Sequence, residues 1–180
     1  MSVQVPNGAI VEIASSYGSA KTMSALSNGN PATAILEVGH NVTSGDIIEV
    51  TSGWSRLNNK IVRALADSDE EVILEDINTS DTVAYPAGGG TGTVREITGW
   101  QQLLQILTST SQGGEQQFLT YQFLEDDAQK QIPTFKNASS LTLSIADDPT
   151  LPGYILAAQA NDDRLPCAVR FTLPDGSVLL

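Results

Sequence analysis

Residues 113–149, GGEQQFLTYQFLEDDAQKQIPTFKNASSLTLSIADDP, decide the fold of this chain. Apolar and polar side chains alternate in two runs, 119–124 and 141–146, and this period of two is typical of strands that bury one face. A polar loop, Glu125–Lys136, joins the runs and is longer and more charged than a hairpin needs. We therefore expect two strands and a loop that reaches beyond its own core. The apolar positions of the strands are Leu119, Tyr121, Phe123, Leu141, Leu143 and Ile145.

Turn signals divide the rest of the chain into further short runs of strand type. Examples are Asn7-Gly8, Ser44-Gly45-Asp46 and Pro174-Asp175-Gly176, and glycine, asparagine and aspartate all favour such turns. The segment Trp100–Leu107 fits helical and strand spacing alike, and we favour a strand. The chain is thus predicted to be mainly β.

One helix is predicted near Tyr154–Ala160. Asp147 and Asp148 can cap a helix, and Pro152 is tolerated in a first turn. Residues 28–96 differ from their surroundings in their glycine-rich punctuation and indicate an inserted β module. The predicted fold is a β-sandwich or barrel with one short flanking α-helix and an inserted small β module.

Charge and composition limit the classes of function. The 180 residues suffice for one domain with a core or for two small domains. The net charge of −12 repels phosphates, which excludes a conventional DNA-binding or RNA-binding protein. The acidity has either a functional purpose or the simpler one of keeping the protein soluble. A single cysteine, Cys167, excludes an internal disulfide and fits a reducing cytoplasm. No basic leader and no window near the ~18 apolar residues of a membrane span occur, so we expect neither export nor a membrane anchor.

Candidate catalytic residues give little support for an enzyme. The only histidine, His40, lies in a Gly-His-Asn turn, and Cys167 is expected to pack as a small apolar side chain. The acidic groups Glu125-Asp126-Asp127 and Asp147-Asp148 lack the spacing of a calcium loop and are interpreted as a solvated loop and a helix cap. The glycines of 88–92 lack the Lys-Ser/Thr ending of a phosphate loop. We expect no catalytic residue, no metal site and no cofactor.

Several short pieces follow one another in a set order through the C-terminal half. They are Gly113-Gly114-Glu115, Tyr121-Gln122-Phe123-Leu124-Glu125-Asp126-Asp127, Gln131-Ile132-Pro133-Thr134, Ile145-Ala146-Asp147-Asp148-Pro149 and Ala168-Val169-Arg170-Phe171. In this order they resemble the tail tube, or major tail, proteins of long-tailed bacteriophages. Residues 28–96 also look like the small β insertion of some of these proteins, with 51–58 and 84–90 as the matching runs.

The resemblance implies a structural virion protein whose homo-hexameric rings stack into the hollow tail tube. It implies other tail proteins, such as the tape measure and terminator proteins, as partners. It also implies passage of genome DNA without specific binding, a location in the virion tail, and assembly in the cytoplasm of the host bacterium. Acidic walls would lower the adhesion of DNA to such a conduit.

The resemblance also implies an organisation in three parts. An N-terminal strand and arm of the tube domain (1–27) precede the inserted β module (28–96), and the tail-tube core (97–180) follows. The family pattern continues into further strands after Pro174-Asp175-Gly176, so we expect this core to lack its final strands.

Two roles are hypothesised for residues 113–149, because exposed sheet edges can pair between neighbouring subunits and a head-to-tail interface can close a ring. The two strands are assigned to the tube wall. The loop is assigned to stacking one ring on the next, through Glu125, Asp126, Asp127, Gln129, Lys130 and Gln131.

A β-rich baseplate or adhesin module that binds cell-surface glycans is the alternative function. It would need exposed aromatic side chains as sugar platforms, and Trp54, Tyr85 and Trp100 are the candidates. The tube of a contractile secretion machine shares the architecture, and the sequence leaves it open as well.

Overall fold

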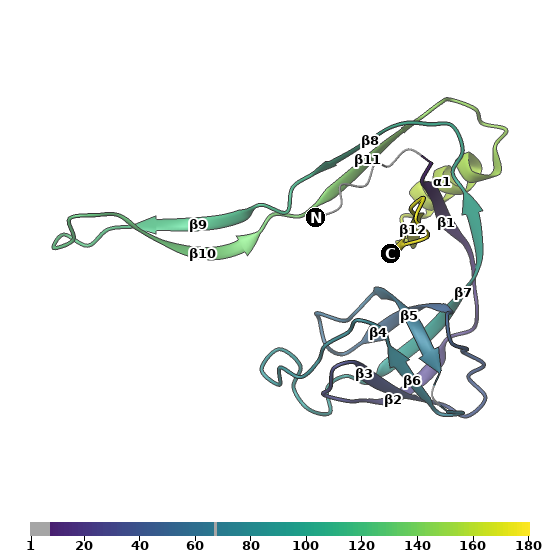
Figure 1. Cartoon of the computed structure of the whole chain (residues 1–180), viewed down its shortest axis with the longest axis horizontal. Coiled ribbons are helices and arrows are strands. Elements are labelled where there is room, and N and C mark those ends of the chain that lie inside the picture. The colour runs from purple at the N-terminus through teal and green to yellow at the C-terminus, as the bar shows by residue number, and fades with distance from the viewer. Residues whose placement is uncertain (1–7, 67) are drawn as a thin grey trace. The chain divides into compact units, whose positions relative to one another are not determined.

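The computed structural model describes residues 8–66 and 68–180. The described residues form a mainly β structure with one helix, as the sequence predicts. They form two units, which Figure 1 shows: the residues up to Leu103 together with Thr150–Leu180, and Leu104–Pro149. The strands of the first unit are β1 (Ile10–Tyr17), β2 (Lys21–Leu26), β3 (Ala32–Leu36), β4 (Ile47–Ser52), β5 (Lys60–Ala66), β6 (Glu71–Leu74), β7 (Gly92–Gln102), β12 (Val169–Thr172) and β13 (Val178–Leu179).

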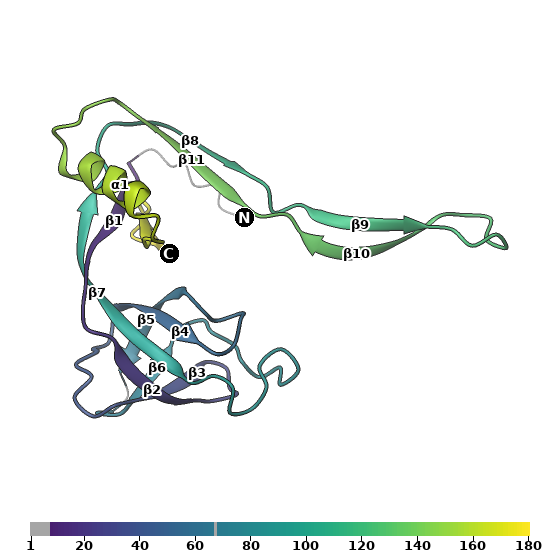
Figure 2. The ribbon, with the colours of Figure 1, turned by 180° about the vertical axis from the view of Figure 1, so that it is seen from behind.

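Six strands of the first unit close into a barrel in the order β7-β2-β3-β6-β5-β4 (Figures 1 and 2). Closure depends on the first half of β7, where Val94 lies opposite Lys21 of β2 on one side and Val50 of β4 on the other. Gly92 permits this close approach, because a Cβ there would collide with the carbonyl of Thr51. Among the described strands of the barrel, closure leaves no free edge.

The barrel has an apolar core of its own. Leu74 and Val94 are fully buried at its centre. Trp54 closes one end, where its Nε1–H donates to the carbonyl of Pro86 at 2.8 Å and its ring meets Tyr85 edge-on at 5.2 Å. The buried core residues are Met23, Leu26, Ala32, Ala34, Leu36, Val42, Ile48, Val50, Trp54, Leu57, Val62, Ala64, Val72, Leu74 and Val94. Residues 28–96 thus supply most of the barrel, and β2 completes it from an earlier point in the chain.

The second half of β7 leaves the barrel and forms a smaller sheet with β1, β12 and β13. Arg170 of β12 links three of these strands. Its guanidinium lies 2.6 Å from the carboxylate of Glu12 on β1 and 4.3 Å from the ring centroid of Trp100 on β7, so a charge-assisted hydrogen bond and a cation–π contact act together.

The helix α1 (Pro152–Asp163) follows the second unit. Its N-cap is Leu151, which makes no side-chain capping hydrogen bond, and Pro152 occupies the first turn as expected. The prediction that Asp147 and Asp148 cap this helix is wrong, because both lie before the cap position. Gly153 is buried against the carbonyl of Gln102, where a Cβ would not fit.

The second unit is built from β8 (Ile106–Gln112), β9 (Gln116–Tyr121), β10 (Lys130–Lys136) and β11 (Ser140–Ile145). β8 pairs with β11, and β9 pairs with β10. Much of the predicted loop Glu125–Lys136 is therefore a strand, and residues 122–129 form the turn. The prediction of strand structure in Trp100–Leu107 is confirmed for residues 100–102 and 106–107, whereas residues 103–105 are not in a strand and Gln105 has a φ of 59°.

An ionised carboxylate stabilises the pairing of β2 and β3. Glu37 accepts a hydrogen bond from the N–H of Thr22 at 3.2 Å and lies 3.5 Å from Lys21 Nζ. The hydrogen bond from the Thr22 backbone is the main cause that lowers the pKa of Glu37. A lowered carboxyl pKa adds stability above the unfolded pKa, and this stability is lost as the pH falls through the folded pKa.

We therefore expect Glu37→Gln to lower the melting temperature near neutral pH and to match the unchanged protein in acid. Thermal unfolding of both proteins between about pH 7 and about pH 3 measures the difference, since the ordinary carboxyl pKa lies between these limits. A difference in melting temperature that stays constant over this range would contradict the assignment.

Candidate interaction surface

The second unit exposes apolar side chains that an isolated domain would bury. No residue between 104 and 149 is buried. Two-stranded ribbons are marginally stable by themselves in water, and exposed apolar patches of this kind mark interaction sites. The large apolar side chains exposed on this unit are Leu104, Leu107, Phe118, Leu119, Phe123, Leu124, Ile132, Phe135 and Leu141.

The ribbon of β8 and β11 has two different faces. Paired residues on antiparallel strands share a face, so the register places Leu141 opposite Ser111 and Leu143 opposite Ser109 on one side. Ile145 and Ile106 continue this apolar face past a bulge. The other side, called here the hydroxyl face, consists of Thr108, Thr110, Gln112, Ser140, Thr142 and Ser144.

The ribbon of β9 and β10 carries an apolar pair on each of its two faces. Leu119 pairs with Ile132 on one side, and Phe118 pairs with Pro133 on the other. Phe118 and Leu119 are each more than half exposed. The prediction that these strands bury one face is therefore not met within the chain, and both faces are open to a partner.

The turn of residues 122–129 has a defined structure at the end of this ribbon. Lys130 Nζ lies 2.8 Å from the carboxylate of Asp126, and Gln122 Nε2 donates to the carbonyl of Asp126 at 2.9 Å. Tyr121 and Phe123 meet edge to face at 5.4 Å. Of the predicted stacking residues, Glu125, Asp126, Asp127 and Gln129 lie in the turn, whereas Lys130 and Gln131 begin β10.

Both ribbons present unpaired strand edges. Among the described residues, each of the four strands pairs on one side, so the backbone N–H and C=O groups of the outer edge have no ladder partner. Such edges are templates for pairing with another chain. The unit therefore offers hydrogen-bonding edges and apolar faces together.

The aromatic residues considered as sugar platforms do not form an open surface. Trp54 is 3% exposed within the barrel core. Tyr85 is half-buried against Trp54, and Trp100 is half-buried beneath Arg170. Their positions serve packing in the first unit.

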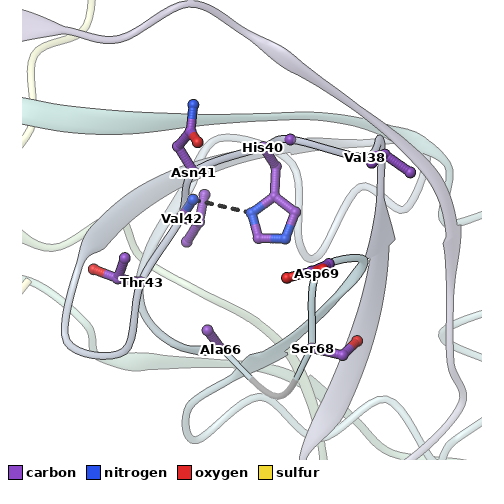
Figure 3. A pocket seen from close by; sticks show the side chains of 9 residues that line it. Val38, His40, Asn41, Val42, Thr43, Ala66, Ser68 and Asp69 are labelled. Atoms are coloured by element: carbon purple, nitrogen blue, oxygen red, sulfur yellow. Dashed lines mark hydrogen bonds between the residues drawn. The ribbon is translucent and has the colours of Figure 1, made fainter.

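The histidine lies in a pocket on the barrel, shown in Figure 3. His40 is buried, and its Nδ1 accepts a hydrogen bond from the N–H of Val42 at 2.9 Å. In a neutral imidazole this leaves the proton on Nε2, which is then a donor and not a metal ligand. The Nε2 atom is enclosed and has no hydrogen-bond partner among the described residues. The Gly-His-Asn spacing predicted the turn but not this burial.

The described residues contain no group of three or more histidine, cysteine, aspartate or glutamate side chains arranged to hold a metal ion. They also contain no helix with the length and hydropathy of a membrane span.

Exposed apolar faces and open strand edges of this kind are typical of structural proteins that associate with other chains. A family model described as phage tail tube protein, TTP, matches residues 52–180, which include the whole second unit. The chain belongs to this family of structural tail proteins. A comparison with curated proteins found no match.

Proposed function

We propose that the chain polymerises through its second unit into homo-hexameric rings, and that the rings stack into a tail tube through which genome DNA passes. The observation that carries the proposal is the unburied second unit, whose apolar faces and open edges need partners. Copies of the same chain meet this need, because a head-to-tail interface that closes on itself forms a ring.

The two ribbons take separate parts in this assembly. Wall strands carrying Leu141, Leu143 and Ile145 pack their apolar face on neighbouring protein. Leu119 and Tyr121 lie on the ribbon of β9 and β10, whereas Phe123, predicted as a strand residue, lies in the turn that follows β9. The turn contacts the next ring. The tape measure and terminator proteins are the expected partners at the two ends of the tube, and assembly takes place in the cytoplasm of the host.

The acidic residues of the second unit suit a channel through which DNA passes. The second unit carries six carboxylates and two lysines, and three of the carboxylates, Glu125, Asp126 and Asp127, are adjacent in the turn. Repeated in every subunit, they give the tube bands of negative charge, which lower the adhesion of DNA phosphates.

We expect Leu141→Asp to give a folded protein that forms no tubes. Leu141 is 48% exposed, so the single chain tolerates a carboxylate there, whereas an interface would have to bury an unpaired charge. Circular dichroism measures the fold, and negative-stain electron microscopy shows rings or tubes.

Val83→Asp is the matched control, because Val83 is 91% exposed on a barrel loop outside the second unit. This variant should assemble like the unchanged protein. Normal tubes from Leu141→Asp would contradict association through β11. A strict monomer in the unchanged protein that binds a glycan array would favour the adhesin alternative.

A further inference from the structure

We propose that the hydroxyl face of β8 and β11 lines the channel of the tube, so that DNA passes over uncharged serine, threonine and glutamine side chains. This inference rests on the proposed tube function. It assigns the channel surface, which the family match does not.

The ribbon of β8 and β11 has one face that gains from burial. Leu141, Leu143 and Ile145 share this apolar face, and burying it against protein removes apolar area from water, which is favourable. The opposite face, with Thr110 and Thr142 paired at its centre, is polar and gains nothing comparable. A ribbon in a tube wall that packs by one face therefore turns its hydroxyl face to water.

The two ribbons differ in their faces. The ribbon of β9 and β10 carries an apolar pair on each face, Leu119 with Ile132 and Phe118 with Pro133, so each face exposes apolar side chains to water. It is best covered on both sides by neighbouring subunits. The hydroxyl face of β8 and β11 is thus the polar ribbon face available to line a channel.

No charged residue occurs in β8, β9 or β11, although the chain has 21 acidic and 9 basic residues. Surfaces that meet bulk water normally carry interspersed charges. An uncharged polar face instead suits a sliding polyanion, because it offers no lysine or arginine for phosphates to bind and releases no counterions. The channel wall then consists of this neutral surface and of the acidic bands that the turns form.

Cysteine labelling of assembled tubes tests the proposal. Cys167 is the single cysteine, so a Cys167→Ala protein provides the background. Thr142→Cys places a thiol on the hydroxyl face, Leu143→Cys places one on the apolar face, and Val83→Cys places one on the barrel loop. Each tube is treated with a small maleimide and with a maleimide attached to a large polymer that cannot enter a channel.

We expect Thr142→Cys to react with the small reagent alone, Val83→Cys with both reagents, and Leu143→Cys with neither. Reaction of Thr142→Cys with both reagents would place the hydroxyl face outside the tube, and reaction with neither would place it in a subunit contact; both results overturn the inference. Thr110→Cys, on the paired position of the same face, repeats the test if Thr142→Cys does not assemble. Absence of tubes from the Cys167→Ala background, seen before any labelling, would overturn the proposed function itself and the inference with it.

Discussion

A chain in which a short Gly-Ser linker joins Leu103 directly to Thr150 should fold as a monomer and form no tubes. All the buried side chains of the described structure belong to the first unit, so its core stays complete. The joining points are close, because Gln102 and Gly153 are in contact. We therefore expect a melting temperature close to that of the full chain, together with complete loss of assembly, measured by calorimetry and negative-stain electron microscopy.

The full chain purified in parallel is the control for this deletion. Tubes formed by the shortened chain would show that subunits associate through the barrel or the smaller sheet. This result would contradict the assignment of subunit association to the second unit. A shortened chain that cannot fold would show that the ribbons stabilise the first unit; Leu141→Asp, which keeps every residue of both units in place, then tests assembly alone.

Replacement of residues 122–129 by Asn-Gly should give rings that do not stack. Tyr121 pairs with Lys130 at the end of the ribbon, and Asn-Gly is the preferred two-residue connection between paired strands. The change therefore keeps the register of β9 and β10 and removes the turn alone. Electron microscopy should show single rings in place of tubes.

A second variant separates the shape of the turn from its charge. Glu125→Gln, Asp126→Asn and Asp127→Asn together keep the length of the turn while removing its carboxylates. If stacking depends on the shape of the turn, this variant forms tubes and the Asn-Gly variant does not. Tubes of normal length from the Asn-Gly variant would show that ring stacking does not use residues 122–129.

The sequence predicted the strands of the second unit better than their pairing. Alternation identified 141–145 of β11 and the last half of β9, but it extended β9 into the turn at 122–124 and did not detect residues 108–112 of β8. β10 was missed, because Pro133 interrupts it and a register shift between Pro133 and Lys136 breaks its period of two. The strand was therefore interpreted as loop. The alternation separated apolar from polar positions in β11 but not in β9, where Phe118 lies on the face opposite Leu119. It also cannot tell whether the partner of an apolar face lies in the same chain.

Long-range contacts explain the other differences. The pairing of β7 with β4 joins Gly92 to Ser52 and depends on residues far apart in sequence, so local patterns predicted an inserted module without its closure. Asp147 and Asp148 have the chemistry of caps, yet Pro149 and Thr150 still precede the N-cap residue. His40 likewise shares its pocket with Ala66, Ser68 and Asp69, which no local sequence pattern connects to it.

The barrel is attached through two neighbouring strands, and this has a consequence for how the protein can change. The N–H of Gly18 donates to the carbonyl of Glu96 at 2.8 Å, so the chain enters and leaves the barrel at almost the same point. The smaller sheet continues on the other side of this point, with Tyr17 paired to Ile97. A segment joined in this way can be exchanged for another domain with adjacent ends while β1 and the second half of β7 stay paired. Residues 19–95 can therefore be replaced by a foreign domain, and each subunit would then carry one copy of that domain.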